Sequence, residues 1–198
     1  GTTVNFPIVH GTDDEHYLKT DFYGQTSWVS FGSIFLSAAN AADFSDANNI
    51  VYGHHMNDGS MFSPFADFGD VDTFNGHRIV YVFTPTANYQ LTTFSIVHCA
   101  ADDPLAQTAF ASEQERQAYV QDKVDRSVVT VAGLPSAADM KHTFAFSTCD
   151  NLASNGRWVL FAYESGSTAA ASSVVADDSN INPEDVAAVS EAAKETAA

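Results

Sequence analysis

Short runs of β-branched and aromatic residues, separated by polar turns, dominate the first part of the chain. Runs of this kind, bounded by Gly, Asn, Asp or Pro, are typical of β-strands. The pattern predicts strands at residues 6–9, 32–36, 49–52, 77–84, 87–99, 143–149 and 157–163. The neighbouring runs HRIVYVFTP and ANYQLTTFSIVHC predict a long hairpin that turns near residues 85–87.

Helical patterns are fewer than strand patterns. The strongest is SEQERQAYVQDKVDR at residues 112–126, because Ser112 can cap a helix and Glu115, three residues later, completes a capping box. Shorter helical candidates lie at residues 13–18 and 60–68.

The composition changes at Gly166. SGSTAAASSVVADDSN is small and polar, as linkers are, and NPEDVAAVSEAAKETAA then predicts a helix at residues 183–195. We therefore predict a folded domain over residues 1–165 and a tail rich in Ala, Ser and Asp over residues 166–198.

Composition and charge exclude several classes of protein. Hydrophobic residues make up 45% of the chain, which supports a globular fold, and the net charge of −17 argues against nucleic-acid binding because phosphates are repelled. Two cysteines are too few for a disulfide scaffold, although one bridge between Cys99 and Cys149 is conceivable. The chain has no apolar run long enough to span a membrane.

The stretch FAFSTCDNLASNGRWVLFAY carries Cys149 at the end of a predicted strand and Arg157 at the start of the next. If these strands form a hairpin, the two side chains lie close together. A nearby base or cation favours the nucleophilic thiolate, and an arginine can stabilise an oxyanion. A buried structural cysteine, and a surface arginine paired with a carboxylate, are the alternatives. Every second residue of a strand points to the same face. We therefore expect Cys149 on a face of small and polar side chains, opposite the face that carries the phenylalanines.

A second cluster, NIVYGHHMNDGSMF, ends a predicted strand with two histidines. Histidine is the side chain best suited to proton transfer near neutral pH. A zinc site made by His54, His55 and Asp58 is a rival interpretation, but no further ligand group has a recognisable spacing. A polar loop with hydrogen-bonded histidines is the third interpretation. We expect no metal and no cofactor.

Taken in order, YGHHMNDGSMF, FSTC and the arginine eight residues later resemble the signatures of the sortases, and of class B sortases in particular. NFPIVHGTDDEHYLKTDFYGQTSWVSFGSIFL resembles the N-terminal region of that class. The segment between residues 99 and 143, with its predicted helix, resembles the insertion that class B members carry before the cysteine strand. The resemblance covers about residues 4–163 and leaves out the tail.

The resemblance implies a mainly β fold with a few helices: an eight-stranded sortase-type β-barrel with an N-terminal helix and a helix in the insertion. It implies that Cys149 is the nucleophile, with His54 and Arg157 as its catalytic partners, and that His55 points away. Phe146 departs from the smaller aliphatic residue of many members. The residues expected to bind substrate are Ser147, Thr148, Tyr17 and Leu18.

The function that the resemblance implies is that of a cysteine transpeptidase. Such an enzyme cleaves the sorting signal of a surface protein after threonine, forms a thioester, and transfers the protein to an amine of a peptidoglycan precursor or a pilin. It works outside the membrane of a Gram-positive cell, and we expect an N-terminal helical anchor upstream of Gly1. A peptidase with the same residues that only hydrolyses, and a secreted binding module without catalysis, are the alternatives.

Overall fold

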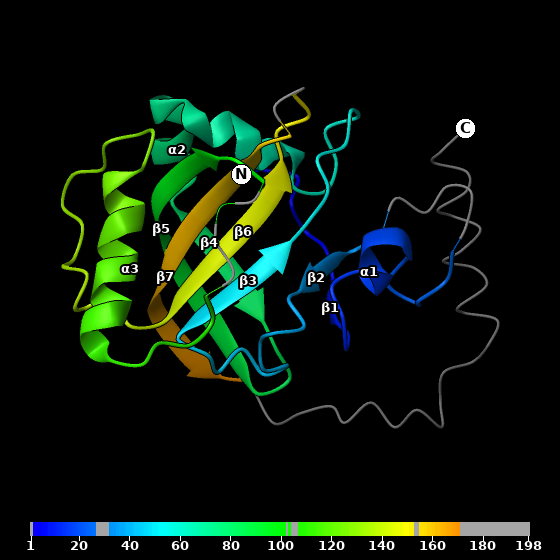
Figure 1. Cartoon of the computed structure of the whole chain (residues 1–198), viewed down its shortest axis with the longest axis horizontal. Helices are drawn as coiled ribbons and strands as arrows, with labels where there is room; N and C mark the ends of the chain where they lie inside the picture. The colour runs from blue at the N-terminus through cyan, green and yellow to red at the C-terminus, as the bar shows by residue number, and fades with distance from the viewer. Residues whose placement is uncertain (1, 27–31, 102, 104–106, 153–154, 171–198) are drawn as a thin grey trace.

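The computed structural model describes residues 2–26, 32–101, 103, 107–152 and 155–170. Its strands form one mixed sheet in the order β1-β2-β3-β6-β7-β5-β4 (Figure 1). The strands are β1 (Ile8–His10), β2 (Ile34–Leu36), β3 (Asn48–Tyr52), β4 (Ile79–Phe83), β5 (Ala87–Cys99), β6 (Thr143–Cys149) and β7 (Arg157–Ala169). The helices are α1 (His16–Lys19), the 3-10 helix η1 (Ser63–Gly69), α2 (Val71–Gly76) and α3 (Glu113–Asp125).

The predicted mainly β fold is confirmed, but the predicted count of eight strands is wrong for the described residues. Seven strands make a sheet that curls into half a barrel, with β1 and β4 as its two edges (Figure 1). The long pair β5 and β7 shifts register between Gln90 and Leu91 and again between Thr93 and Ser95. Such irregularities increase the local twist and so help the sheet to curl.

Two connections predicted from the sequence are present as hairpins. β4 pairs antiparallel with β5, and β6 pairs antiparallel with β7. The observed bounds of β5 and β6 agree with the prediction, whereas β7 extends six residues further than predicted and ends at Ala169. The helix predicted at residues 183–195 lies outside the described residues, so the division into a domain and a tail stays a prediction.

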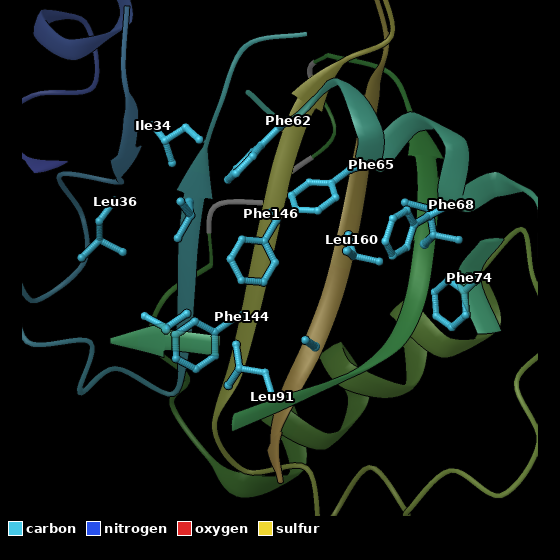
Figure 2. Close-up of a cluster of buried hydrophobic side chains, with 14 of the residues drawn as sticks. Ile34, Leu36, Phe62, Phe65, Phe68, Phe74, Leu91, Phe144, Phe146 and Leu160 are labelled. Atoms are coloured by element: carbon cyan, nitrogen blue, oxygen red, sulfur yellow. The ribbon is translucent and has the colours of Figure 1, made fainter. Parts of the chain in front are cut away.

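Aromatic side chains fill the concave face of the sheet. Phe144 and Phe146 of β6 meet Phe62, Phe65 and Phe68, which η1 and its cap bring down onto the strands (Figure 2). The edge of Phe146 meets the ring of Phe62 with their centroids 6.0 Å apart. A phenylalanine at position 146 is therefore accommodated by the phenylalanine-rich segment that packs over it.

The other face of β6 is buried as well, which corrects the expectation of an open polar face. A second apolar cluster joins Ala145 to Ile50, Phe161 and the α3 residues Tyr119 and Val120. Alternation shows which residues share a face but not what covers that face. Only the end of β6, at Cys149, is partly exposed.

Helix α3 begins and ends close to the predicted positions. The Ser112 hydroxyl accepts a hydrogen bond from the Glu115 N–H (3.2 Å), as the capping box predicts. The Glu115 carboxylate accepts from the N–H of Ala111 (2.7 Å) and not from that of Ser112.

Helix α2 was not predicted. Asp70 caps it by accepting a hydrogen bond from the Thr73 N–H (2.8 Å), which lowers the pKa of the Asp70 carboxyl. Helix α1 is a single turn at His16–Lys19, which overlaps the short helical candidate predicted at residues 13–18. Within the described ranges, no helix combines the length and the apolar character needed to cross a bilayer.

The buried guanidinium of Arg116 fixes the loop that leads from α3 into β6. It donates to the carbonyl oxygens of Met140 (2.7 Å), Ala138 (3.2 Å) and Ala137 (3.3 Å), and it also pairs with Glu113. The side chain is only 4% exposed, so these carbonyl groups depend on it for hydrogen bonds.

We predict that Arg116→Met lowers the free energy of unfolding by about 2–4 kcal/mol, because buried carbonyl oxygens lose their donors. Denaturant unfolding followed by circular dichroism measures the change. The matched control is Lys141→Met, which removes an exposed charge from the same loop and is expected to change stability by less than about 0.5 kcal/mol. Equal stability of the two variants would contradict the assigned role of Arg116.

Candidate active site

Strand pairing brings the predicted nucleophile and the predicted arginine together. Cys149, the last residue of β6, lies opposite Arg157, the first residue of β7. On the other side of β7, Arg157 lies opposite Cys99 of β5. Because β7 runs between them, the two cysteines are free, and the conceivable disulfide is absent.

The same register brings His54 to the level of Cys149. β3 runs parallel to β6 with Tyr52 opposite Ser147, and the Gly53 N–H donates to the Ser147 carbonyl (3.0 Å). His54 lies two residues after Tyr52, and Cys149 lies two residues after Ser147. A Cβ at Gly53 would lie 2.5 Å from the Phe62 ring, so the glycine between the tyrosine and the histidine is required by packing.

All three predicted catalytic residues line one pocket of about 270 Å³. Leu18, Phe35 and Tyr52 form its apolar wall, and the end of β6 forms its floor. The other residues that line it are Asp14, Gly53, Ser147 and Thr148.

The predicted substrate-binding residues divide into two groups. Ser147, Thr148 and Leu18 line the pocket, whereas Tyr17 does not. The backbone carbonyl of Tyr17 accepts a hydrogen bond from the Ser33 N–H instead (2.8 Å). The hydroxyl of Thr148 is buried and makes no hydrogen bond to another described residue.

The His54 imidazole is held against the N-terminal region. Its Nε2–H donates to the backbone carbonyl of Leu18 (3.0 Å). Gly32 adopts a positive φ of 82°, and a Cβ there would lie 2.7 Å from the His54 Nε2 atom and 2.5 Å from the Leu18 carbonyl oxygen. Gly32 was predicted at the start of a strand over residues 32–36, and its positive φ was missed; β2 begins at Ile34, and the glycine itself was the available signal.

Among the described residues, Arg157 forms hydrogen bonds only with neutral groups of its own turn. Its Nη1 donates to the carbonyl oxygens of Gly156 (2.9 Å) and Asn155 (3.2 Å). Within the described part of the chain it forms no ion pair with a carboxylate, so the alternative of an ordinary ion-paired surface arginine does not apply. Its guanidinium charge remains available to a ligand in the pocket.

Tyr52 and Asp14 were missed as pocket residues. Burial raises the pKa of the Tyr52 hydroxyl, and the nearby Asp14 carboxylate raises it further, while a hydrogen bond with Ser37 and the charge of Arg157 act in the opposite direction. Asp14 in turn accepts hydrogen bonds from the Ser37 hydroxyl (3.0 Å) and the Ala38 N–H (2.6 Å). The signal for Tyr52 was its position two residues before His54 on a strand, which puts both on one face.

His55 faces the opposite side of Cys149 from the pocket that His54 lines, as alternation along an extended chain predicts. The His55 imidazole is hydrogen-bonded there. Its Nδ1–H donates to the Cys149 carbonyl (2.8 Å), and the Asn151 side-chain amide donates to the His55 carbonyl (2.9 Å). In the described part of the chain no three metal-ligating side chains gather, so the zinc interpretation gains no support.

The second cysteine has a different environment. Burial raises the pKa of the Cys99 thiol, and the Asp103 carboxylate raises it further. Its Sγ lies 3.8 Å from the Arg157 carbonyl oxygen. Cys149 is therefore the cysteine that a ligand in the pocket can reach.

Comparison with known proteins identifies the family, although no family model matches the chain. Sortase B of Listeria monocytogenes is 30% identical over 149 residues, which are 75% of this chain and 59% of the relative. Sortase B of Staphylococcus aureus is 29% identical over 151 residues, which are 76% of this chain and 60% of the relative. The chain thus spans about three fifths of the length of these curated relatives.

Solved structures agree with the sequence comparison. Clostridium perfringens sortase B has a TM-score of 0.76 and 28% identity, over 83% of this chain and 88% of the other. A Bacillus anthracis sortase B in complex with AAEK2 has a TM-score of 0.70 and 30% identity, over 82% of this chain and 72% of the other. A Staphylococcus aureus sortase B–substrate complex has a TM-score of 0.74 and 26% identity, over 84% of this chain and 77% of the other. By sequence and by fold, the chain belongs to the class B sortases.

Proposed function

We propose that the protein is a cysteine transpeptidase that cleaves a C-terminal sorting signal after threonine and transfers the upstream protein to an amine. The observation that carries the proposal is the convergence of Cys149, His54 and Arg157 on one pocket. These side chains supply a nucleophile, a proton carrier and a cation, which are the groups that acyl transfer through a thioester needs.

The proposed reaction begins with a sorting peptide lying extended in the pocket. The Cys149 thiolate attacks the carbonyl carbon of the threonine residue, and the guanidinium of Arg157 stabilises the negative oxygen that forms. The C–N bond then breaks as His54 gives a proton to the departing amine. The product of this half-reaction is a thioester on Cys149.

In the second half-reaction an incoming amine attacks the thioester. The C–S bond breaks, an amide forms, and His54 takes the proton that the amine loses. Water in place of the amine gives hydrolysis. Formation of amide product when amine is added therefore distinguishes a transpeptidase from the alternative, a peptidase with the same residues that only hydrolyses.

The pocket suits an extended peptide with small apolar and polar side chains. Leu18, Phe35 and Tyr52 offer apolar contacts, and Ser147 and Thr148 lie beside them in the lining. A related Staphylococcus aureus sortase B has been solved as a substrate complex, which supports a surface-protein substrate for this chain. The relatives come from Listeria and Staphylococcus, so we propose that the enzyme acts at the surface of a Gram-positive cell.

The direct test is mass spectrometry of the intact protein after incubation with a panel of sorting peptides, with and without an amine. We expect a thioester adduct on the wild-type protein, no adduct on Cys149→Ala, and release of a peptide–amine product when amine is present. Acid product alone, at every amine concentration, would support the hydrolysing peptidase. No adduct with any peptide on a folded protein would support the binding module.

We predict that Arg157→Gln lowers kcat/KM for peptide cleavage by about 10²- to 10³-fold, because the oxyanion loses its charged donor. Its melting temperature should stay close to that of the wild type, since among the described residues Arg157 donates only to carbonyl oxygens of Asn155 and Gly156. The matched control is Arg126→Gln, which breaks the ion pair with Asp103 away from the pocket. That variant should retain cleavage within about threefold, and similar losses in both variants would count against the proposed role.

A further inference from the structure

The residue directly after Cys149, Asp150, has a deeply buried carboxylate. Its side chain is only 1% exposed, and a charged group so far from water is stable only when hydrogen-bond donors face it. The Leu152 N–H donates to Oδ1 (2.9 Å), and the His98 imidazole donates through Nε2–H to Oδ2 (2.9 Å). The second bond joins the end of β5 to the residue that follows the proposed nucleophile.

His98 reaches this carboxylate from the far side of β7. In the pairing of β5 with β7, His98 lies opposite Trp158, which lies opposite Thr148 on its other side. The imidazole stacks on the Trp158 indole, with ring centroids 4.4 Å apart and planes 16° apart. Strand pairing and stacking therefore orient the imidazole toward Asp150, although the His98 side chain is 36% exposed.

Gly156 makes the close approach of these groups possible. A Cβ at Gly156 would lie 2.4 Å from Oδ2 of Asp150 and 3.1 Å from Nε2 of His98. The Asp150 N–H in turn donates to the Gly156 carbonyl (3.1 Å). Any side chain at position 156 would thus push the histidine and the carboxylate apart.

Two of the three residues proposed for catalysis adjoin this contact. Cys149 directly precedes Asp150, and Arg157 directly follows Gly156. The bond from His98 holds Asp150 in place, and Gly156 packs on the same two groups. The relative position of the thiol and the guanidinium therefore depends on His98, which is not among the described residues that line their pocket.

We propose that His98 is a positioning residue for acyl transfer. Through its hydrogen bond to the Asp150 carboxylate, it holds Cys149 and Arg157 in the relative position that attack on the threonine carbonyl needs. The inference rests on the proposed transpeptidase function and adds no chemical step to it. His98 neither touches the substrate nor carries a proton of the reaction.

The pocket geometry separates this role from peptide binding. The apolar wall is formed by Leu18, Phe35 and Tyr52, which come from α1, β2 and β3 and not from the strands that His98 joins. Loss of the bond should therefore slow the chemical step and leave peptide binding nearly unchanged, because alignment of the reacting groups affects the rate at saturation. A pair that only stabilises the fold would lower the melting temperature without this effect on the rate.

The test measures three quantities: the rate of thioester formation at saturating sorting peptide, the peptide concentration that gives half this rate, and the melting temperature. His98→Phe keeps a ring to stack on Trp158 and removes the donor, whereas His98→Gln supplies a donor without the ring. The matched control is His77→Phe, because the His77 Nδ1–H also donates to an oxygen, the Thr73 carbonyl (2.9 Å), outside the described lining of the pocket. All rates are measured at a temperature at which every variant is folded.

We expect His98→Phe to lower the saturating rate by about 10- to 100-fold and to change the half-saturating concentration by less than about threefold. His98→Gln should recover most of the rate, since its side-chain amide can donate to the same carboxylate. The double variant His98→Phe/Asp150→Asn should be no slower than the slower of its two single variants, because substitutions that act through one bond are not additive. His77→Phe should change neither kinetic quantity.

The other outcomes overturn the inference in distinct ways. An unchanged saturating rate in His98→Phe would leave the pair as a stabilising contact alone, and a higher half-saturating concentration at that unchanged rate would assign His98 to peptide binding. Failure of His98→Gln to recover the rate, or an equal loss in His77→Phe, would show that the bond to Asp150 is not the cause. Failure of wild type to form any thioester would instead reject the proposed function, and the inference with it.

Discussion

The antiparallel pairing of β6 with β7 is the constraint on which the site depends. It sets Cys149 opposite Arg157, and the parallel pairing of β6 with β3 sets His54 at the same level. A shift of one residue in either pairing would turn the side chains of β6 to the other face. The chemistry of the site therefore rests on main-chain hydrogen bonds within the β6–β7 hairpin and between β6 and β3, which lies far from the hairpin in the sequence.

Burial of both faces of β6 protects that register. Phe144 and Phe146 are packed under the η1 segment on one side (Figure 2). Ala145 is packed under α3 on the other side. A slipped strand would exchange phenylalanine for alanine in two close-packed cores, which cores tolerate poorly. The strand leaves this double cover only at Cys149, so the same packing that holds the sheet leaves this cysteine partly exposed at its end.

Much of this arrangement could be predicted because it depends on patterns among residues that are close together in the sequence. Alternation and turn residues predicted β5 and β6 with their observed bounds, and the resemblance carried by the short motifs predicted the family and six of the residues that line the pocket. Contacts between distant segments could not be predicted. The cover of α3 over Ala145, the packing of Gly32 on His54 and the approach of Asp14 to Tyr52 each depend on tertiary structure. Helix α2 was missed because six residues carry little periodic signal.

The central claim is that Cys149 acts as the nucleophile in the pocket that it lines together with His54 and Arg157. Alkylation by iodoacetamide, followed by peptide mapping of the two cysteines, tests it most directly. The account predicts that Cys149 is modified before Cys99, whose thiol is held largely protonated by burial, and that a bound sorting peptide protects Cys149. Modification of both cysteines at equal rates, with no protection by any sorting peptide, would contradict the account.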